Sequence, residues 1–431
     1  MSEHLEKKIN SHEAIIGVIG MGYIGCSLLE VFGYKGYSLI GYDVDPKKVE
    51  MMQREASPFN HMDLKALFSL IEKKRFRPTC DPHLLKEADI LVISVPTSLD
   101  DYYQPNLLPL ERAFQTVQKS LRKDQLIVLQ STTYPGTTVE VLLPLLNQST
   151  LKVGHDFFLT YVPEVSDIGN PDHTFTQIPR IISGITSACL KMGKLLYQNI
   201  GCQIVEATST QVAESAKILQ NAYRLVNCAL INELKITFDR LGIDIWEVIQ
   251  AASSKPFGFT PFYPGPGAGG DCIPVDPQYL IWKARKTDGP TTLLENASAV
   301  NREIPYFVVD KVIQGLDRHQ KSLKGAKILL LGIGYKKDVN DVRQSASLKI
   351  LSLLRQRGAN VFYHDPFISE IDGLKSRDLH YVEFKDYDAI VIATDHSIYD
   401  WKAVVLHSQL IIDTRNVTTG IPGAHEKVIK G

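Results

Sequence analysis

A glycine-rich hexapeptide near the N-terminus constrains the fold more than any other feature of the sequence. Residues 14–25 read AIIGVIGMGYIG. The apolar run 14–19 predicts a buried parallel strand, and residues 24–32 predict a helix. Between them lies a GxGxxG pattern, whose glycines let the backbone approach a pyrophosphate while N–H groups at the helix start bind it. This strand, loop and helix together predict a dinucleotide-binding domain.

An acidic residue at the end of the next predicted strand indicates which dinucleotide is bound. The stretch YSLIGYDVD contains Asp43, 18 residues after Gly25 and near the spacing of about 20 expected for a ribose-binding acid. A carboxylate at this place accepts hydrogen bonds from the ribose hydroxyls and repels a 2′-phosphate. We therefore expect NAD rather than NADP, with a Rossmann-like domain that holds no cofactor as the alternative.

Three further apolar runs in the first half predict more strands of the same sheet. Residues 88–97, 125–138 and 155–164 end in segments that contain Thr97, Thr132 and Glu164. In open α/β sheets, ligands bind beyond the carboxyl ends of the strands, so these three side chains are candidates to line one crevice. The alternative for each is ordinary turn chemistry, in which threonine and proline are common.

The middle of the chain predicts one long helix. Residues 209–241 contain neither proline nor glycine, Ser209 or Thr210 can cap the start, and Gly242 can end it. At 1.5 Å per residue such a helix is about 45 Å long, enough to join two domains and pair with a partner subunit. Lys217 and Asn221 are four residues apart and share one face; the alternative is two polar residues on a solvated flank.

The second half of the chain repeats the strand pattern of the first. Residues 325–335 read GAKILLLGIGY, and the runs 359–366, 388–396 and 409–416 predict three more strands, without a full GxGxxG. The loop 335–343 reads YKKDVNDVR, whose basic groups suit phosphates or form a generic charged loop. The fold class is therefore α/β, with two Rossmann-like parallel-sheet domains joined by a long central helix and a cleft between them.

Composition excludes several classes of protein. A chain of 431 residues predicts two or three domains, and a net charge of −1 argues against nucleic-acid binding. No apolar run approaches 18 residues, so no membrane span is expected. The six cysteines form no CxxC pair, which favours neither a metal site nor a disulfide framework and fits a reducing cytoplasm. Residues 1–13 are polar and predict a ragged tail rather than a signal peptide.

One cysteine stands in an unusual setting. Residues 265–277 read GPGAGGDCIPVDP, in which glycine and proline exclude a helix around Cys272. A structural thiol is usually buried in a well-packed element, whereas a reactive thiol lies on an accessible loop. The segment alone leaves both interpretations open.

Taken together, these motifs resemble those of the nucleotide-sugar 6-dehydrogenases, the UDP-glucose/UDP-N-acetylhexosamine dehydrogenase family. The resemblance covers nearly the whole chain, in the order GMGYIG, SVPT, STTYPGTT, VPE, AESAKILQNAYR, KPFGFTPFYPGPGAGGDCIPVDP, GYKKDVNDVR and DTRN. It implies oxidation of the C6 alcohol of a UDP-sugar to a carboxylate with two NAD, usually in a homodimer built round the long helix. The segments KPFGFTPFYPGPG and CIPVDP resemble the N-acetylhexosamine branch.

The resemblance also implies roles for individual residues. Cys272 would be the nucleophile, Lys217 and Asn221 would hold the oxyanion of the addition intermediates, Asp276 would act on water with Thr132, and Glu164 would assist thioester hydrolysis. The cofactor site would comprise Gly20, Met21, Gly22, Tyr23, Ile24, Gly25, Asp43, Lys48, Thr97, Thr132 and Arg343. The substrate site would comprise Glu164, Lys217, Asn221, Phe262, Tyr263, Gly269, Lys336 and Arg415. The implied parts are a tail (1–13), an NAD-binding domain (14–208), a central helical domain with the cysteine loop (209–310) and a UDP-sugar-binding domain (311–431).

Four residues depart from the family's pattern. Val275 stands where the UDP-glucose branch often has lysine, Val165 stands where an arginine commonly follows Pro-Glu, and Gln344 replaces a usual glutamate. Asp271 precedes the cysteine, where a negative charge should raise the pKa of the thiol. These departures bear on which sugar is the substrate more than on which reaction takes place. The alternatives are UDP-glucose as substrate, or an NAD-binding protein without turnover.

Overall fold

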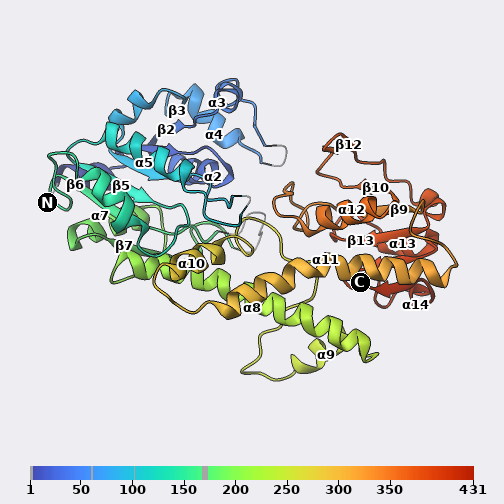
Figure 1. Cartoon of the computed structure of the whole chain (residues 1–431). Helices are drawn as coiled ribbons and strands as arrows, with labels where there is room; N and C mark the ends of the chain where they lie inside the picture. The colour runs from blue at the N-terminus through green and yellow to red at the C-terminus, as the bar shows by residue number, and fades with distance from the viewer. Residues whose placement is uncertain (1–2, 60–61, 101, 167–172) are drawn as a thin grey trace. The chain divides into compact units, whose positions relative to one another are not determined.

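The computed structural model describes residues 3–59, 62–100, 102–166 and 173–431. The chain divides into two compact units, the first formed by residues 1–220 with 278–288 and the second by residues 221–277 with 289–431. Each unit contains one large sheet, as the two sets of apolar runs predicted (Figure 1).

The sheet of the first unit has eight strands in the order β3-β2-β1-β4-β5-β6-β7-β8. All neighbours are parallel except β6 and β7. The direction of strand order reverses between β1 and β4, which is where such sheets bind dinucleotides. The strands are β1 (Ile15–Ile19), β2 (Ser38–Tyr42), β3 (Phe76–Thr79), β4 (Ile90–Ile93), β5 (Gln125–Leu129), β6 (Phe157–Tyr161), β7 (Arg180–Gly184) and β8 (Ile204–Glu206).

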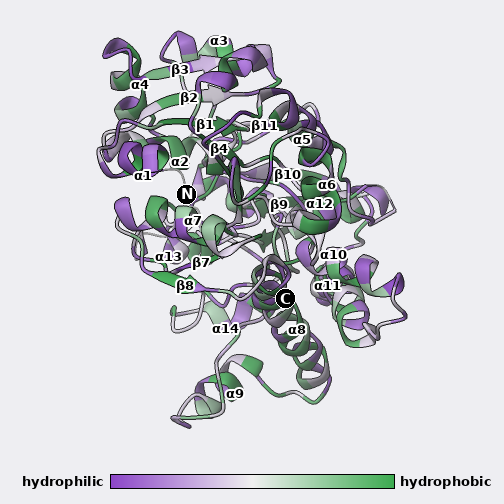
Figure 2. Cartoon of the chain, turned by 90° about the vertical axis from the view of Figure 1, so that its left-hand side faces the viewer, coloured by the Kyte–Doolittle hydropathy of each residue, from purple (hydrophilic) through white to green (hydrophobic). Residues whose placement is uncertain are grey.

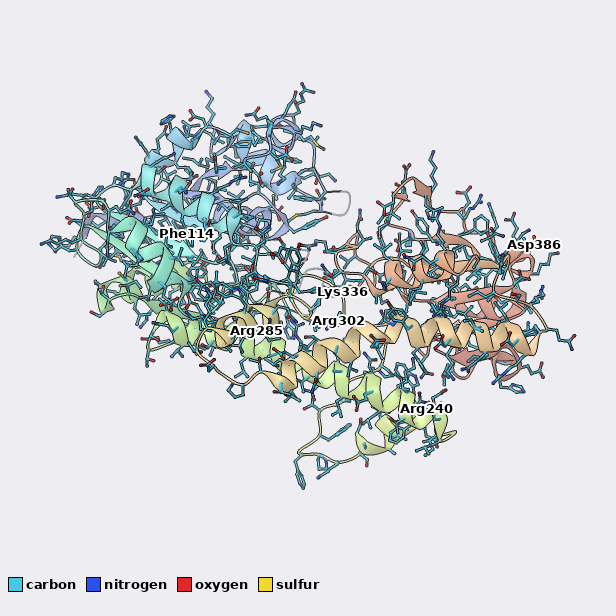
Figure 3. All side chains as sticks on the ribbon, viewed as in Figure 1. Phe114, Arg240, Arg285, Arg302, Lys336 and Asp386 are labelled. Carbon is cyan, nitrogen blue, oxygen red and sulfur yellow. The ribbon has the colours of Figure 1, made fainter. Side chains whose placement is uncertain are left out.

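Helices pack on this sheet through apolar side chains. The central strands are hydrophobic along their length, as Figure 2 shows for β1 and β4, because both faces of a parallel sheet are covered. Phe114 of α5, labelled in Figure 3, is completely buried in this core. The helices are α1 (Glu3–Asn10), α2 (Tyr23–Tyr34), α3 (Pro46–Gln53), α4 (Lys65–Glu72), α5 (Leu108–Ser120), α6 (Leu143–Leu146) and α7 (Ser187–Asn199).

The prediction of a ragged N-terminal tail is wrong. Residues 3–10 form α1, whose Leu5 and Ile9 are completely buried in the core of the first unit. Lys8 pairs with Asp89 at 2.9 Å, which adds a polar anchor. Two apolar residues four apart give a helix one buried stripe, and the surrounding charged residues concealed this signal in the sequence.

The predicted long helix is confirmed as α8 (Thr210–Arg240). Its start is capped by Ser209, whose hydroxyl accepts a hydrogen bond from the N–H of Val212 at 3.2 Å. Gly242 follows its end with a φ of 71°, a left-handed conformation that glycine adopts at little cost. Residues 210–220 of this helix belong to the first unit and residues 221–240 to the second.

The sheet of the second unit has five parallel strands in the order β10-β9-β13-β14-β15. The four runs predicted from the sequence correspond to four of these strands, and the last strand was not predicted. The strands are β9 (Lys327–Leu331), β10 (Asn360–His364), β13 (Ala389–Ile392), β14 (Ile411–Asp413) and β15 (Val428–Lys430), beside a small hairpin of β11 (Glu370–Ile371) and β12 (Leu374–Lys375).

Helices cover this second sheet as well. Their apolar faces and the strands form two clusters, one on each face of the sheet. The helices that cover it are α11 (Thr292–Arg318), α12 (Ala346–Gln356), α13 (Trp401–His407) and α14 (Ala424–Lys427). Helix α9 (Ile245–Ala252) packs instead on α8. Helix α10 (Asp276–Arg285) begins in the second unit and continues in the first. In the described part of the chain, no helix combines the length and apolar character that a membrane span requires.

Candidate active site

The three glycines of the GxGxxG loop differ in the space that a side chain would find at each position. Gly20 has a φ of 97°, and a Cβ there would lie 2.4 Å from the carbonyl oxygen of Ser94. A Cβ at Gly25 would lie 1.8 Å from the carbonyl oxygen of Gly20, so helix α2 and the loop could not approach each other. By contrast, a Cβ at Gly22 would meet nothing within 4 Å. The open space beside Gly22, at the start of α2, fits the pyrophosphate of a dinucleotide.

Asp43 lies where the sequence predicted, just after β2, and it also organises the glycine loop. Its carboxylate accepts hydrogen bonds from the N–H of Met21 at 2.8 Å and of Asp45 at 3.0 Å. Lys48 of α3 pairs with the same carboxylate at 2.7 Å. The structure therefore brings together Met21, Asp43 and Lys48, three of the residues expected to bind the cofactor.

Thr97, Thr132 and Glu164 follow β4, β5 and β6, which are neighbours in the sheet. Hydrogen bonds tie these strand ends together. The hydroxyl of Ser131 accepts from the N–H of Val95 at 2.9 Å, and the side-chain amide of Gln130 donates to Glu164 at 2.5 Å. The segments that carry the three candidate residues are therefore joined by hydrogen bonds at one edge of the sheet, within the first unit.

Glu164 has a buried cationic partner that the sequence analysis missed. Nη1 of Arg180 donates to its carboxylate at 3.0 Å, and the N–H of Ser166 donates at 2.6 Å. Burial alone would raise the pKa of Glu164, but Arg180 and these hydrogen bonds hold the pKa below its usual value. Arg180 is the first residue of β7 and is fully buried. Its guanidinium carbon lies 3.6 Å from the centroid of the Phe175 ring. In the sequence, the only indication of this partner was a charged residue at the start of an apolar strand.

The second unit brings together the cysteine, an asparagine and an aspartate. Cys272 is exposed, and its carbonyl accepts a hydrogen bond from the N–H of Asp276 at 3.0 Å. Asp276 begins α10 and accepts a hydrogen bond from the amide of Asn221, and Arg224 donates to the amide oxygen of the same asparagine. Both Asn221 and Asp276 are buried. Lys217, which lies in the first unit, is buried too. Lys217 and Asn221 are therefore not two polar residues on a solvated flank of α8.

The negative charge before the cysteine is paired. Asp271 forms an ion pair with Arg343, which also binds Asp341 through two of its nitrogens. The N–H of Gly270 donates to the carbonyl of Arg343 at 2.9 Å, so backbone and side chain both join the cysteine loop to the loop after β9. Gly270 has a φ of 81°, and a Cβ there would lie 2.7 Å from the ring of Tyr335. The loop therefore depends on glycine at this position.

The glycine loop of the second sheet is arranged differently from the first. Asp365 follows β10 and accepts hydrogen bonds from the N–H groups of Ile333 and Gly334, at 2.8 and 3.0 Å. The imidazole of His396 donates to the same carboxylate at 3.1 Å, because its other nitrogen accepts from the N–H of Asp338. Asp43 holds the N–H of Met21 in the same way in the first loop, so the second loop differs in that its second glycine, Gly334, also donates to the acidic side chain.

The remaining candidates for substrate binding lie in the second unit. Lys336, labelled in Figure 3, is on the loop after β9. A Cβ at Gly265 would lie 3.0 Å from Nη1 of Arg415, so this guanidinium packs directly against the Pro-Gly segment. Tyr263 is exposed and stacks on Trp246 at 5.6 Å, and Phe262 contacts Tyr223 of α8 edge-on at 5.7 Å.

The described residues contain no cluster of side chains that could hold a metal ion. All six cysteines lie in the described part of the chain, and none of them forms a disulfide.

Three family models match the chain in sequence order. They describe the NAD binding, central and UDP binding domains of the UDP-glucose/GDP-mannose dehydrogenase family and match residues 14–201, 211–303 and 329–420. The chain is 32% identical to protein CapL of Staphylococcus aureus, over 93% of this chain and 96% of that protein. It is also 32% identical to a UDP-N-acetyl-D-glucosamine 6-dehydrogenase of Pseudomonas aeruginosa, over 89% and 90% of the two chains.

A solved structure gives the same result. The UDP-N-acetyl-D-mannosamine dehydrogenase of Pyrococcus horikoshii is 28% identical, and the two structures match with a TM-score of 0.86 over 95% of this chain and 97% of that one. The expected resemblance and the α/β fold class are both confirmed.

Proposed function

Because the chain belongs to the UDP-glucose/GDP-mannose dehydrogenase family and is an NAD-dependent oxidoreductase, we propose that it oxidises the C6 alcohol of a UDP-N-acetylhexosamine to a carboxylate. The observation that carries this proposal is the setting of Cys272, an exposed thiol on the loop that leads directly into Asp276. An exposed thiol beside buried hydrogen-bonding groups is what covalent catalysis requires, and a single two-electron oxidation would not need it.

The overall change removes four electrons from the sugar carbon. When bound, NAD accepts two of these electrons in each of two successive oxidations. After the first oxidation, the thiolate of Cys272 adds to the C6 aldehyde and forms a thiohemiacetal. The second oxidation converts this adduct into a thioester, and water then breaks the carbon–sulfur bond to release the carboxylate and the thiol.

Further side chains would stabilise these species. Lys217 and the amide of Asn221 would hold the oxyanion of the addition intermediates, a role that suits buried, preorganised donors. Asp276, which the Asn221 amide holds in place, would position the attacking water with Thr132. Glu164 would act in thioester hydrolysis, and its lowered pKa supports an ionised carboxylate there at neutral pH.

Other residues would bind the UDP group. Lys336 and Arg415 carry the positive charge that a diphosphate requires. Phe262, Tyr263 and the backbone at Gly269 would enclose the nucleotide. Arg343 would lie on the NAD side, where its pairs with Asp341 and Asp271 fix its position.

The choice of an N-acetylated sugar rests on the relatives. The names of the Pseudomonas and Pyrococcus proteins give N-acetylglucosamine and N-acetylmannosamine as their sugars. The experiment is to supply UDP-N-acetylglucosamine, UDP-N-acetylmannosamine, UDP-N-acetylgalactosamine and UDP-glucose in limiting amounts and to count the NADH formed per sugar. We expect two NADH per sugar with one N-acetylated substrate and no acid from the Cys272→Ser variant.

Each other result would replace the proposal with a defined alternative. Turnover on UDP-glucose alone would make the protein a UDP-glucose 6-dehydrogenase. One NADH per sugar, or normal acid formation by Cys272→Ser, would exclude the thioester route. NAD binding without turnover on any of the four sugars would indicate a non-catalytic NAD-binding protein.

We also propose that the protein is a homodimer that works in the reducing cytoplasm, where Cys272 stays a thiol. Within the second unit, α8 and the residues after it expose large apolar side chains that a globular surface rarely leaves in water. These side chains are Tyr223, Leu230, Leu241 and Ile243. A second copy of α8 would cover them.

A further inference from the structure

Glu214 is a buried carboxylate that the proposed reaction does not use. It lies on α8 in the first unit, and its side chain is completely inaccessible to solvent. One carboxylate oxygen accepts a hydrogen bond from the N–H of Gly136 at 2.5 Å. The other oxygen accepts from both the N–H and the hydroxyl of Thr138, at 2.9 and 2.6 Å. Such a site is costly to build, because a carboxylate must leave water to occupy it.

These three hydrogen bonds join two segments that carry proposed catalytic residues. Gly136 and Thr138 belong to the turn that continues from Thr132, at the carboxyl end of β5. Lys217 lies three residues beyond Glu214 on α8, on the same side of the helix. Both segments lie in the first unit. Glu214 is therefore the side chain that ties the Thr132 turn to the helical turn carrying Lys217.

The surroundings make the charge of Glu214 sensitive to pH. Burial raises its pKa to about 7, while the hydrogen bonds from Thr138 and Gly136 oppose this rise and the charge of Glu140 adds to it. Glu140 is itself paired with Lys283 at 2.6 Å, and Tyr134 of the same turn has a pKa raised mainly by burial. An ionised carboxylate accepts all three hydrogen bonds, whereas a proton on either oxygen competes with one of the donors.

We propose that Glu214 is a positioning residue, which in its ionised form fixes Lys217 relative to Thr132 for the oxidation chemistry. This inference rests on the proposed function, and it adds a requirement that the proposed roles of Lys217 and Thr132 do not state. Displacement of a catalytic group by about 1 Å can cost on the order of 10²-fold in rate, so a tie between the two segments has a measurable consequence.

The test compares Glu214→Gln with the wild type in steady-state assays of NADH formation from about pH 5.5 to about 9. In the wild type, kcat should fall below about pH 7 as the carboxylate gains a proton. In Glu214→Gln we expect kcat to fall by about 10–100-fold and to lose this dependence, while the KM for NAD stays within about twofold, because the glycine loop is unchanged.

Two further variants keep the inference open to refutation. Thr138→Val removes only the hydroxyl that donates to Glu214, keeps the side-chain shape, and should lower kcat by about 3–10-fold; it replaces Glu214→Gln if that variant fails to fold. Glu140→Gln is the matched control, since it removes a carboxylate beside the same turn and should leave kcat within about twofold. Wild-type kcat in both Glu214→Gln and Thr138→Val, or an unchanged pH dependence in Glu214→Gln, would overturn the inference and leave the proposed function standing. No turnover by the wild type on any UDP-sugar would overturn both.

Discussion

Arg343 binds Asp271, the residue immediately before Cys272, and Asp341 at the same time. The sequence alone suggested that Asp271 disfavours the thiolate, and the ion pair offsets part of that effect. Replacing Asp271 by Asn removes one negative charge beside the sulfur while Arg343 stays in place through Asp341. We therefore expect iodoacetamide to alkylate Cys272 about 2–5-fold faster at neutral pH in Asp271→Asn than in the wild type.

Peptide mass spectrometry can follow Cys272 separately from Cys80, the other exposed cysteine. Asp310→Asn is the control, because Asp310 forms an exposed ion pair with Arg357 at 3.2 Å in the same unit. Slower alkylation in Asp271→Asn would mean that Asp271 activates the thiol by holding the loop.

Arg180 and Glu164 form a buried ion pair whose members should depend on each other. Arg180→Met leaves the carboxylate of Glu164, whose side chain is only 12% exposed, without its cation, so we expect a loss of about 3 kcal/mol in stability. Combining it with Glu164→Gln should restore part of that loss, because the orphaned charge is removed. Denaturant unfolding of both single variants and the double variant measures the coupling. Additive losses would show that Arg180 acts through its contact with Phe175 instead.

The positions of candidate residues at strand ends were predictable because a parallel sheet has few ways to form. Each apolar run predicts a parallel strand, and the carboxyl ends of parallel strands lie at the same edge of a sheet. Thr97, Thr132 and Glu164 follow such runs and were therefore predicted at one edge. The order of β4, β5 and β6 in the sheet makes them neighbours. Asp43 was predictable for the same reason, from its distance to the glycine loop.

Pairings between residues distant in sequence were not predictable. Nothing near Glu164 in the sequence indicates Arg180, and nothing near Asp271 indicates Arg343, because both partners arrive through the tertiary fold. The hydrogen bonds from Ile333 and Gly334 to Asp365 were hidden likewise, although the sequence did show that the second glycine pattern is incomplete. The buried stripe of α1 was missed because two apolar side chains among charged ones give a weak signal.

Asp43 should determine the choice between NAD and NADP. Its carboxylate lies beside Lys48, and removal of the carboxylate would leave a lysine that can accept a 2′-phosphate. We expect Asp43→Ser to lower the preference for NAD over NADP by about 10–100-fold, measured as the ratio of kcat/KM values. The KM for NAD should also rise, because the N–H of Met21 loses its acceptor. Asp45→Ser, which alters the cap of α3 but keeps Asp43, should leave the ratio unchanged; an unchanged ratio in Asp43→Ser would contradict the assignment of Asp43 to the ribose.

The exposed apolar side chains of α8 give a test of the proposed dimer. Leu230 is 52% exposed, and a charge at the centre of an interface is strongly unfavourable. Leu230→Glu should convert the dimer to a monomer in analytical ultracentrifugation. Leu406 of α13 is also exposed and serves as the control, since Leu406→Glu should leave the assembly unchanged. A dimeric Leu230→Glu variant would place the interface elsewhere.

Lys235 is a buried amine without a hydrogen-bond partner, and it should destabilise the fold at neutral pH. Burial lowers its pKa from an ordinary value of 10.5 to about 7. Between these two values the unfolded chain binds a proton that the folded chain does not, so this residue makes stability rise as pH increases from about 7 to about 10.5. Lys235→Met removes the amine and leaves an unbranched apolar side chain that is one atom shorter.

We therefore expect Lys235→Met to raise the free energy of unfolding by on the order of a few kcal/mol near pH 7, with a gain that shrinks as pH increases toward 10. Thermal unfolding of the full chain at several pH values measures this. Lys311 is the matched control, because it lies near the same ring of Phe307 but pairs with Asp239. Lys311→Met leaves that carboxylate without its partner and should lower stability. A Lys235→Met variant less stable than the wild type would show that the buried amine contributes to folding despite its missing partner.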